Sequence, residues 1–265
     1  TGGEPLVRKN LIYLINKLNM KKNITNLKEI TLTTNGTLLK KYAKDLKNSG
    51  INRLNVSLDT INPEKYKKIT RFGNLNNVLD GINEAIKNKI KVKINVVALQ
   101  HFNDDEFETL IKWCDSLKID ITFIEVMPME ETDIARHLQF VPLNNVFDKL
   151  NSHFNFYKTK KNTGGPAIYY RSKKLSINVG FITPITHNFC ESCNRIRMSS
   201  TGKLFMCLGQ NENIDFRQIL RKDFSDDFIK NKIKFALNIK PKKHDFEINQ
   251  FSKTYVKRHM NVTGG

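Results

Sequence analysis

The chain has 265 residues, 39% of them hydrophobic, which is enough to bury one large core and excludes a disordered protein. No apolar run approaches the roughly 20 residues that span a bilayer, and no charged and then apolar leader opens the sequence. A soluble, cytoplasmic protein is therefore expected. The first residue is Thr1 rather than methionine, so we also expect a fragment or a processed chain.

The formal net charge is +18, and a strongly basic protein suggests nucleic-acid binding because lysine and arginine neutralise phosphates. The lysines are nevertheless spread along the whole chain, often beside asparagine, as in Lys21-Lys22-Asn23 and Lys160-Lys161-Asn162. A compositional bias that gives solvated faces explains this pattern better than a nucleic-acid interface. The charge remains compatible with a small substrate that carries phosphate.

The first half of the chain alternates helical patterns with short, β-branched segments. Helices are expected over residues 7–20, 38–46, 75–88 and 104–118, and strands over 30–32, 54–58, 92–97 and 121–126. This alternation is typical of βα units on a parallel sheet, open or closed into a barrel, whose ligands lie at the carboxyl ends of the strands. The polar residues of those strands and strand ends are Thr33 to Gly36, Ser57, Asp59, Lys93, Asn95, Glu125 and the neighbouring Met127.

The pattern changes after about residue 135. A short helix near 143–150 and an alternating segment over 175–182 lead into a cluster of cysteines. Residues 195–207 are predicted to form a hairpin around Thr201-Gly202, residues 214–237 a helix, and the rest a polar tail.

Three of the four cysteines are clustered and are the main candidates for metal or cluster ligands. Cys190-x-x-Cys193 places two thiols on one tight turn, and Cys207 returns on the far strand of the predicted hairpin, so all three can face one point. The spacing fits a structural zinc, with His187 as a fourth ligand, as well as it fits an iron–sulfur cluster. Cys114 lies in a helical stretch and is predicted to be an ordinary core thiol.

Three basic residues are candidates for binding an anion. Arg195 and Arg197 alternate after the second cysteine, so both guanidinium groups can point to the side of the metal and bind phosphate or carboxylate. Surface ion pairing is the alternative. Lys93 lies in an otherwise apolar strand, where a buried ammonium is costly without an anionic partner. That partner is expected to be a carboxylate such as Glu125, or a phosphate.

Seven motifs, taken in order, resemble one family. They are Thr1-Gly2-Gly3-Glu4-Pro5-Leu6, Thr33-Thr34-Asn35-Gly36, Asn55-Val56-Ser57-Leu58-Asp59, Lys93-Ile94-Asn95-Val96-Val97, Phe123-Ile124-Glu125-Val126-Met127, Phe189-Cys190-x-x-Cys193-x-Arg195-x-Arg197 and Gly264-Gly265. Over essentially its whole length the chain resembles the GTP 3′,8-cyclases of molybdenum-cofactor biosynthesis (the MoaA family), which are radical S-adenosylmethionine enzymes.

The resemblance implies an α/β fold, an incomplete (βα)6 radical-SAM barrel with a C-terminal iron–sulfur extension. Residues 1–135 would form the partial barrel, and residues 136–265 the auxiliary-cluster region with a Gly-Gly tail. In this family an adenosyl radical removes hydrogen from the ribose 3′ carbon of GTP, and that carbon attacks carbon 8 of guanine. The product passes to a partner enzyme that makes cyclic pyranopterin monophosphate. A homodimer is a further expectation.

The family's functional residues carry over to particular positions. Cys190, Cys193 and Cys207 would hold a 4Fe–4S cluster whose open iron meets the guanine of GTP, which decides iron against zinc. Contacts to S-adenosylmethionine are matched by Gly3, Ser57 and Met127, and contacts to GTP by Thr33, Lys93, Arg195, Ile196 and Arg197. Gly264 and Gly265 would form a catalytic tail that reaches into the active site, where only residues without side chains fit.

The sequence departs from the family pattern in two places. The Cys-x-x-x-Cys-x-x-Cys loop, which in this family binds the 4Fe–4S cluster that cleaves S-adenosylmethionine, would precede Thr1. The chain as given is therefore expected to lack this cluster and not to cleave S-adenosylmethionine. Thr122 stands where the family usually has an arginine that faces the cofactor. A zinc-containing nucleic-acid-binding protein and another radical enzyme with an auxiliary cluster are the alternative functions.

Overall fold

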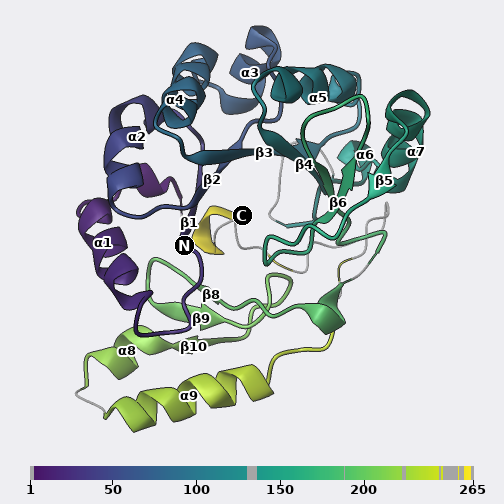
Figure 1. Cartoon of the computed structure of the whole chain (residues 1–265). Helices are drawn as coiled ribbons and strands as arrows, with labels where there is room; N and C mark the ends of the chain where they lie inside the picture. Colours follow the sequence, from purple (N-terminus) through teal and green to yellow (C-terminus); the bar gives the residue numbers. More distant parts are fainter. Residues whose placement is uncertain are drawn as a thin grey trace. The chain divides into compact units, whose positions relative to one another are not determined.

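The computed structural model of the chain (Figure 1) describes residues 3–129, 136–187, 189–222, 225–244, 246, 256 and 260–263. The chain forms two compact units, which are described separately below. The sheet unit comprises Glu4–Val126 and Gln139–Thr183, and the cysteine unit comprises Thr1–Gly3, Met127–Leu138 and Pro184–Gly265. Residues 139–183 thus belong with the first sheet, whereas the sequence placed a single boundary after residue 135.

The sheet unit is built on one mostly parallel sheet. Its strands are β1 (Thr31–Thr34), β2 (Arg53–Ser57), β3 (Lys91–Ala98), β4 (Asp120–Glu125), β5 (Tyr157–Lys158), β6 (Ile168–Arg171) and β7 (Val179–Ile182). They lie in the order β1-β2-β3-β4-β7-β6-β5. The pairs from β1 to β7 are parallel, and β6 and β5 are added antiparallel.

Helices cover the outer face of this sheet in Figure 1. After the short η1 (Pro5–Val7) they are α1 (Leu11–Lys21), α2 (Leu39–Asn48), α3 (Pro63–Thr70), α4 (Leu75–Lys87), α5 (Phe107–Ser116) and α7 (Leu143–Phe154), while α6 (Arg136–Gln139) is a single turn where the chain passes between the units. The four helices and four strands predicted for the first half are therefore confirmed to within a few residues.

One helix of this unit was missed from the sequence. Helix α3 begins after Asn62, whose side chain accepts hydrogen bonds from the backbone N–H groups of Glu64 and Lys65, with Pro63 in the first turn. Asparagine caps and early prolines favour helix starts. Because only Tyr66 of this helix is buried, its sequence shows no apolar periodicity.

The two faces of the sheet differ in chemistry. Side chains alternate between the faces of a strand, and one alternate set is apolar and packs under the helices: Leu54, Val56, Ile94, Val96, Ile121, Phe123 and Val179. Burial of each such side chain stabilises the fold by roughly 1.5–3 kcal/mol. The other alternate set on β1 to β4 is largely polar, and this asymmetry positions the candidate site.

The cysteine unit contains a small antiparallel sheet. Strand β9 (Lys203–Phe205) pairs with β8 (Arg197–Met198) on one side and β10 (Asn213–Asp215) on the other. The predicted hairpin is confirmed, and Gly202 turns it with a φ of 84°, a conformation that glycine adopts without strain. The apolar core of this unit is formed by Leu204, Met206, Phe216 and Ala236.

The helix predicted over 214–237 is wrong in its extent. The segment contains the end of β10, then α8 (Phe216–Leu220) and α9 (Asp226–Asn238). Each helix has its own cap, because the side chains of Asp215 and Ser225 accept hydrogen bonds from the N–H groups of Gln218 and Phe228. Side-chain caps of this kind start new helices. The remaining elements are η2 (Cys190–Ser192) and α10 (Met260–Thr263).

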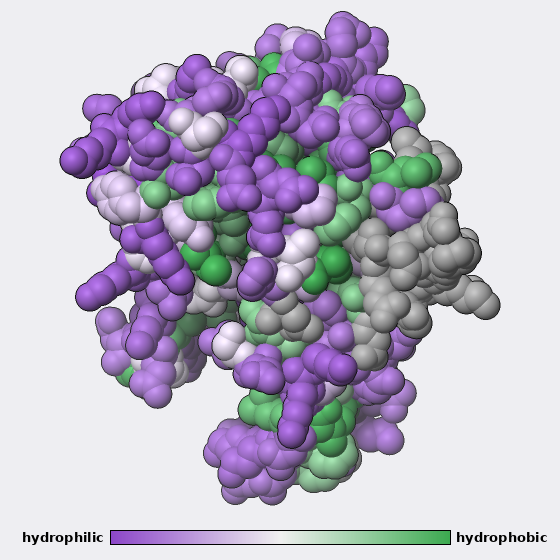
Figure 2. All heavy atoms as spheres, turned by 90° about the vertical axis from the view of Figure 1, so that its right-hand side faces the viewer, coloured by the Kyte–Doolittle hydropathy of each residue, from purple (hydrophilic) through white to green (hydrophobic). Residues whose placement is uncertain are grey.

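The surface is largely hydrophilic, as the basic composition predicts. Hydrophilic side chains dominate the face turned to the viewer in Figure 2. None of the helices within the described ranges is both long and apolar enough to cross a membrane.

Asp59 is a buried carboxyl group whose protonation affects the stability of the sheet unit. Its carboxylate accepts a hydrogen bond of 2.7 Å from the backbone N–H of Val97. Burial raises the pKa of Asp59 from 3.8 to about 6, although this hydrogen bond opposes the shift. Because the folded-state pKa is raised, the group contributes stability below about pH 4, and this contribution is lost as the pH rises through about 6.

We therefore expect Asp59→Asn, which keeps the acceptor oxygen but does not titrate, to gain stability relative to the native protein as the pH rises. The difference in the free energy of unfolding should grow by ~3 kcal/mol between about pH 4 and pH 7. Urea denaturation of both proteins at one-unit pH intervals measures it. A difference in the free energy of unfolding that stays constant over this range would show that the pKa of Asp59 is not raised in the folded protein.

Candidate functional site

A row of polar side chains crosses the sheet from β1 to β4. The register places Thr33 opposite Asn55, Asn55 opposite Lys93, and Lys93 opposite Asp120. Residues paired in this way project from the same face of a sheet. The sheet therefore brings together Thr33 and Lys93, two of the five residues that the sequence predicts as contacts to GTP.

A chain of hydrogen bonds orients Thr33. Glu29 accepts from Arg53 through both carboxylate oxygens, at 3.2 Å to Nε and 3.0 Å to Nη2. Arg53 donates from Nη1 to Asn55 Oδ1 at 2.6 Å, and Asn55 Nδ2 donates to Thr33 Oγ1 at 3.3 Å. Since the amide of Asn55 supplies a proton to the Thr33 oxygen, the Thr33 O–H is left to donate to a ligand.

Lys93 is the most unusual member of the row, because only 7% of its surface is exposed. Its Nζ lies 3.4 Å from the hydroxyl of Tyr169. Burial lowers the pKa of Lys93, and Arg53 contributes in the same direction, while Tyr169 and Asp120 oppose the shift. A buried ammonium held in this way is well suited to an incoming anion.

Glu125 is not the partner of Lys93, so that alternative was wrong. The register places Glu125 opposite Ala98, at the other end of β3. Its Oε1 accepts a hydrogen bond of 3.2 Å from the N–H of Leu143, at the start of α7. Carboxylates are favourable at helix starts, so Glu125 is explained by helix capping.

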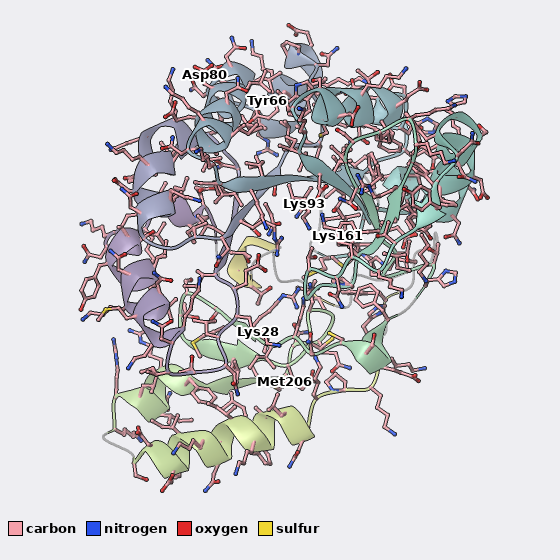
Figure 3. All side chains as sticks on the ribbon, viewed as in Figure 1. Lys28, Tyr66, Asp80, Lys93, Lys161 and Met206 are labelled. Atoms are coloured by element: carbon pink, nitrogen blue, oxygen red, sulfur yellow. The ribbon has the colours of Figure 1, made fainter. Side chains whose placement is uncertain are left out.

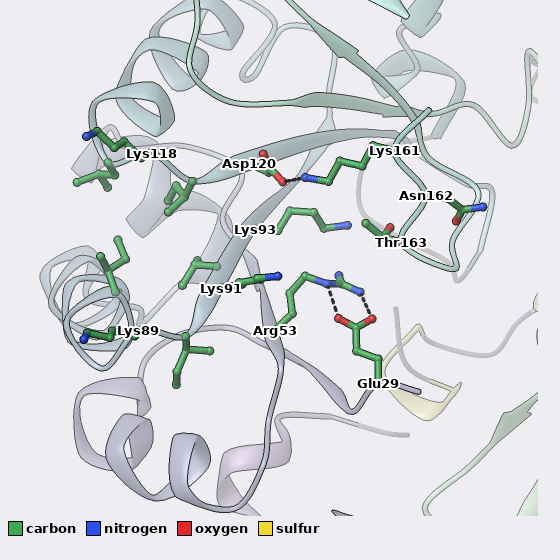
Figure 4. Close-up of a pocket in the computed structure, with 15 residues that line it drawn as sticks. Glu29, Arg53, Lys89, Lys91, Lys93, Lys118, Asp120, Lys161, Asn162 and Thr163 are labelled. Carbon is green, nitrogen blue, oxygen red and sulfur yellow. Dashed lines mark hydrogen bonds and ion pairs between the residues drawn. The ribbon is translucent and has the colours of Figure 1, made fainter. Parts of the chain in front are cut away.

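Two ion pairs flank Lys93 in the pocket of Figure 4. On one side Asp120 binds Lys161, and on the other Glu29 binds Arg53. The pocket has a volume of about 760 Å³, and its further basic lining residues are Lys89, Lys91 and Lys118. Figure 3 shows Lys93 and Lys161 as neighbours in the same region of the sheet unit.

The pocket lies at the amino ends of the strands, whereas the sequence pattern predicts ligands at their carboxyl ends. Arg53, Lys91 and Asp120 are the first residues of β2, β3 and β4 and all line it. The prediction was based on the general preference of parallel sheets for ligands at carboxyl ends. The row of Lys93 also lies nearer the amino ends, because Lys93 is the third residue of β3 and its neighbour Asp120 is the first residue of β4.

A second polar row lies two residues further along the strands, ~7 Å from the first. It joins Ser57 to Asn95, Asn95 to Thr122, and Thr122 to Gly180. Ser57 is exposed and Thr122 is fully buried. The Oδ1 atom of Asn95 is buried and has no hydrogen-bond partner among the described residues. Leaving a buried acceptor without a hydrogen bond costs ~1–3 kcal/mol. A ligand that donates a hydrogen bond to Asn95 Oδ1 would remove this cost.

Glu4 has a role that sequence reasoning missed. Its carboxylate accepts hydrogen bonds from the Thr34 hydroxyl and the Asn35 N–H, both at 2.7 Å. It also accepts one from the Leu6 N–H at 3.0 Å. Glu4 thereby holds the loop that follows β1, and a carboxylate directly after two glycines and before a proline was the available signal.

The three clustered cysteines lie around the small sheet of the cysteine unit. Cys190 begins η2, the N–H of Cys193 donates to the carbonyl of Cys190 at 3.0 Å, and Cys207 follows β9. All three cysteines are half-buried, and none of them forms a disulfide. Burial raises the pKa of Cys190, with smaller contributions in the same direction from Cys207 and Cys193, so the three sulfur atoms are close enough to interact.

The geometry of the thiols bears on the kind of metal that they fit. Among the residues that the structure describes, no three histidine, cysteine or acidic side chains converge as a single metal ion requires. His187, which the zinc alternative needs, is exposed. A 4Fe–4S cluster does not need such convergence, because each thiolate binds a different iron. Cys114 is fully buried, as predicted for a core thiol, and burial raises its pKa.

The arginines after the second cysteine alternate in exposure. Arg195 and Arg197 are half-buried, while Ile196 and Met198 are 39% and 40% exposed. Burial lowers the pKa of Arg195, and interaction with Cys193 opposes the shift, so Arg195 lies near that thiol.

The remaining predicted residues are placed as follows. Gly3 is exposed, and Met127 is half-buried against the apolar cluster of Met129, Phe246 and Val256. Both belong to the cysteine unit, whereas Ser57 belongs to the sheet unit. Gly264 and Gly265 lie outside the described residues.

Comparison with known proteins identifies the family. The family model described as the Radical SAM superfamily matches residues 1–114, and the model described as Molybdenum Cofactor Synthesis C matches residues 119–246. The GTP 3′,8-cyclases of Brucella ovis and Brucella abortus are each 49% identical to the chain over 266 residues, which is 100% of this chain and 77% of each relative. The chain belongs to the GTP 3′,8-cyclase family.

A solved structure supports the fold of this family member. Streptococcus suis SuiB bound to S-adenosylmethionine aligns with a TM-score of 0.55 and 14% identity, over 88% of this chain and 56% of that one. The chain thus spans little more than half the length of SuiB. At this identity the likeness shows the fold alone, an α/β fold with a mostly parallel sheet that is similar to a radical SAM enzyme.

Replacement of Lys93 tests whether burial of its charge destabilises the native protein. Lys93→Met keeps the length of the side chain and removes the buried charge, so we expect the free energy of unfolding at pH 7 to rise by about 1–2 kcal/mol. Because the folded-state pKa is lowered, native stability itself increases with pH up to about 10.5, and the gain should shrink over that range.

Urea denaturation at pH 7 and pH 10 measures both effects. Lys44→Met is the control, since Lys44 is an exposed residue of α2 and its replacement should leave stability within about 0.5 kcal/mol. A loss of stability on replacing Lys93 would show that its charge is already well paired in the native protein.

Proposed function

We propose that this protein is a GTP 3′,8-cyclase of molybdenum-cofactor biosynthesis, which converts GTP to 3′,8-cyclo-7,8-dihydro-GTP with S-adenosylmethionine as the radical source. The observation that carries the proposal is the 49% identity to proteins of that name across the whole chain. The Radical SAM and Molybdenum Cofactor Synthesis C models cover its two halves in succession. Its cyclic product would pass to the downstream enzyme that makes cyclic pyranopterin monophosphate.

The parallel strands support a finer proposal for the fold, an incomplete (βα)6 barrel of the radical SAM type. Five strands run parallel, in the order β1-β2-β3-β4-β7. Helices cover one face and polar residues line the other. A barrel interior is the place where such a polar face binds a ligand away from bulk water.

Thr33 and Lys93 are proposed to bind the phosphates of GTP. Lys93 offers a buried ammonium whose pKa is lowered by burial, and an anion would compensate the cost of that burial. Thr33 offers a hydroxyl whose oxygen already accepts from Asn55. Arg53 and Lys161, which flank Lys93 in the pocket, are each held by a carboxylate, whereas the Nζ of Lys93 hydrogen-bonds to the neutral hydroxyl of Tyr169.

Cys190, Cys193 and Cys207 are proposed to hold a 4Fe–4S cluster. The donor set fits, because three half-buried cysteines outside any disulfide lie near one another on the turn and hairpin of one small unit. Such a cluster, when bound by three thiolates, keeps one iron open for a substrate ligand. Arg195, Ile196 and Arg197 follow the second cysteine and are proposed to contact the guanine end of GTP.

Gly3, Ser57 and Met127 are proposed to contact S-adenosylmethionine, and Gly264 and Gly265 to act in catalysis. The exposed hydroxyl of Ser57 and the unpaired Oδ1 of Asn95 lie in the same polar row, which supports a polar ligand at that level of the sheet. Thr122 is in this row too. A threonine there supplies no charge, so any cofactor carboxylate must be bound by another group.

The cluster assignment is tested by replacing single cysteines. After anaerobic reconstitution, the protein should contain about four irons and four sulfides for this cluster. Cys207→Ser should lose most of this iron, while Cys114→Ser should retain it, because Cys114 is a buried core thiol. Iron and sulfide analysis with the visible absorption spectrum measures this. Stoichiometric zinc without sulfide in the native protein would favour the zinc-binding alternative instead.

The substrate assignment is tested by calorimetric titration of the reconstituted protein with GTP. Lys93→Met should weaken GTP binding by roughly 10- to 100-fold, the value of one charge-assisted hydrogen bond. Lys44→Met should leave the affinity unchanged. Equal affinities of the native protein and the Lys93 variant would remove Lys93 from the phosphate site, and failure of the native protein to bind GTP would contradict the proposed function.

A further inference from the structure

Lys240 lies two residues beyond the end of α9 and makes two hydrogen bonds that nothing in the assigned function explains. Its Nζ donates to the carbonyl of Arg195 at 2.8 Å and to the carbonyl of Met206 at 2.6 Å. Arg195 lies two residues after Cys193, and Met206 directly precedes Cys207. One ammonium therefore connects both cysteine-bearing segments.

The hairpin ladder does not make this connection itself. Strands β8 and β9 pair Met198 with Leu204 and Arg197 with Phe205, and the ladder ends there. Continued by two residues, the same register would bring Arg195 opposite Cys207. The backbone carbonyls at this end need other donors, and Lys240 supplies them. It thus holds the two segments together at the point where the sheet stops.

The segment after Lys240 also supplies a donor to the thiol of Cys190. The backbone N–H of His244 donates to Cys190, and Lys240 is close enough to act on that thiol electrostatically. The His244 ring contacts the carbonyl of Pro184 through Nε2 at 3.0 Å. The segment from Lys240 to His244 therefore passes beside the first cysteine.

The same segment packs against the loop that holds the third cysteine. The N–H of Gly209 lies 3.4 Å from Cys207 Sγ. A side chain at Gly209 would place its Cβ 2.8 Å from the Cβ of His244, so this close approach requires glycine. These contacts hold Lys240 in place relative to Cys190 and to the loop of Cys207.

We propose that Lys240 is a positioning residue of the three-cysteine centre: it holds the Cys193 and Cys207 segments in register and places a positive charge beside the bound cluster. The inference rests on the proposed function, because it concerns the cluster that the thiols would bind. Hydrogen bonds and net charge near the sulfur atoms set the potential of an iron–sulfur cluster. Outer residues that orient ligands commonly change metal affinity by roughly 10- to 100-fold.

The test compares Lys240→Met, Lys240→Arg and Lys242→Met in the reconstituted full chain. Lys242 is exposed and two residues away, so its replacement is a matched control. We expect Lys240→Met to lose iron to a chelator roughly tenfold faster than the native protein and to have a more negative cluster potential, because a nearby cation favours the reduced, more negative cluster. Lys240→Arg should restore the potential, since it restores the charge.

Several outcomes distinguish this inference from its alternatives. A native protein that takes up no iron and sulfide would contradict the proposed function and the inference together. A native cluster with an unchanged potential and an unchanged rate of iron loss in Lys240→Met would overturn the inference alone. Faster iron loss without a shift in potential would show that Lys240 acts only through the backbone and would refute its electrostatic role. If Lys240→Met does not fold, a Lys240→Gln variant provides the same comparison.

Discussion

The two-sided chemistry of the parallel sheet is the constraint on which the candidate site depends. One alternate set of side chains on β1 to β4 is apolar and buried under the helices, which fixes the register of the strands. A slip of one residue would bury the polar set and expose the core. The same register then aligns Thr33, Asn55, Lys93 and Asp120 across four strands. The hydrophobic core thus positions the polar row. Its stability also offsets the free-energy cost of burying Lys93.

The cysteine unit also holds its candidate ligands in fixed positions, but its apolar core is much smaller. Its main buried cluster is small, so local hydrogen bonds must hold the thiols in place: the η2 turn between Cys190 and Cys193, the β8–β9 ladder, and the ammonium of Lys240 beyond the end of that ladder. Cluster binding would add to this stability, because metal-binding free energy is also folding free energy. Interaction of Cys190 with the other two thiols disfavours its thiolate, while the charge of Lys240 favours it.

Much of this architecture could be predicted from the sequence, because local patterns determine it. The apolar periodicities predicted four strands and four helices of the first half, and Thr201-Gly202 predicted the hairpin that returns Cys207. What could not be predicted depends on register and on distant partners. Tyr169 meets Lys93 across 76 positions, Asp120 binds Lys161 across 41, and Glu125 caps α7 rather than pairing with Lys93. No local pattern carries this information, and the position of the pocket at the amino ends of the strands follows from the same long-range pairings.

The central claim is that the three thiols bind a cluster with one iron open to GTP. Mössbauer spectroscopy of the chain reconstituted with ⁵⁷Fe, recorded with and without GTP, tests it most directly. The account predicts a 4Fe–4S spectrum in which one iron differs from the others and changes when GTP is added. A spectrum of this cluster that is identical with and without GTP would contradict the account, and so would the absence of a cluster.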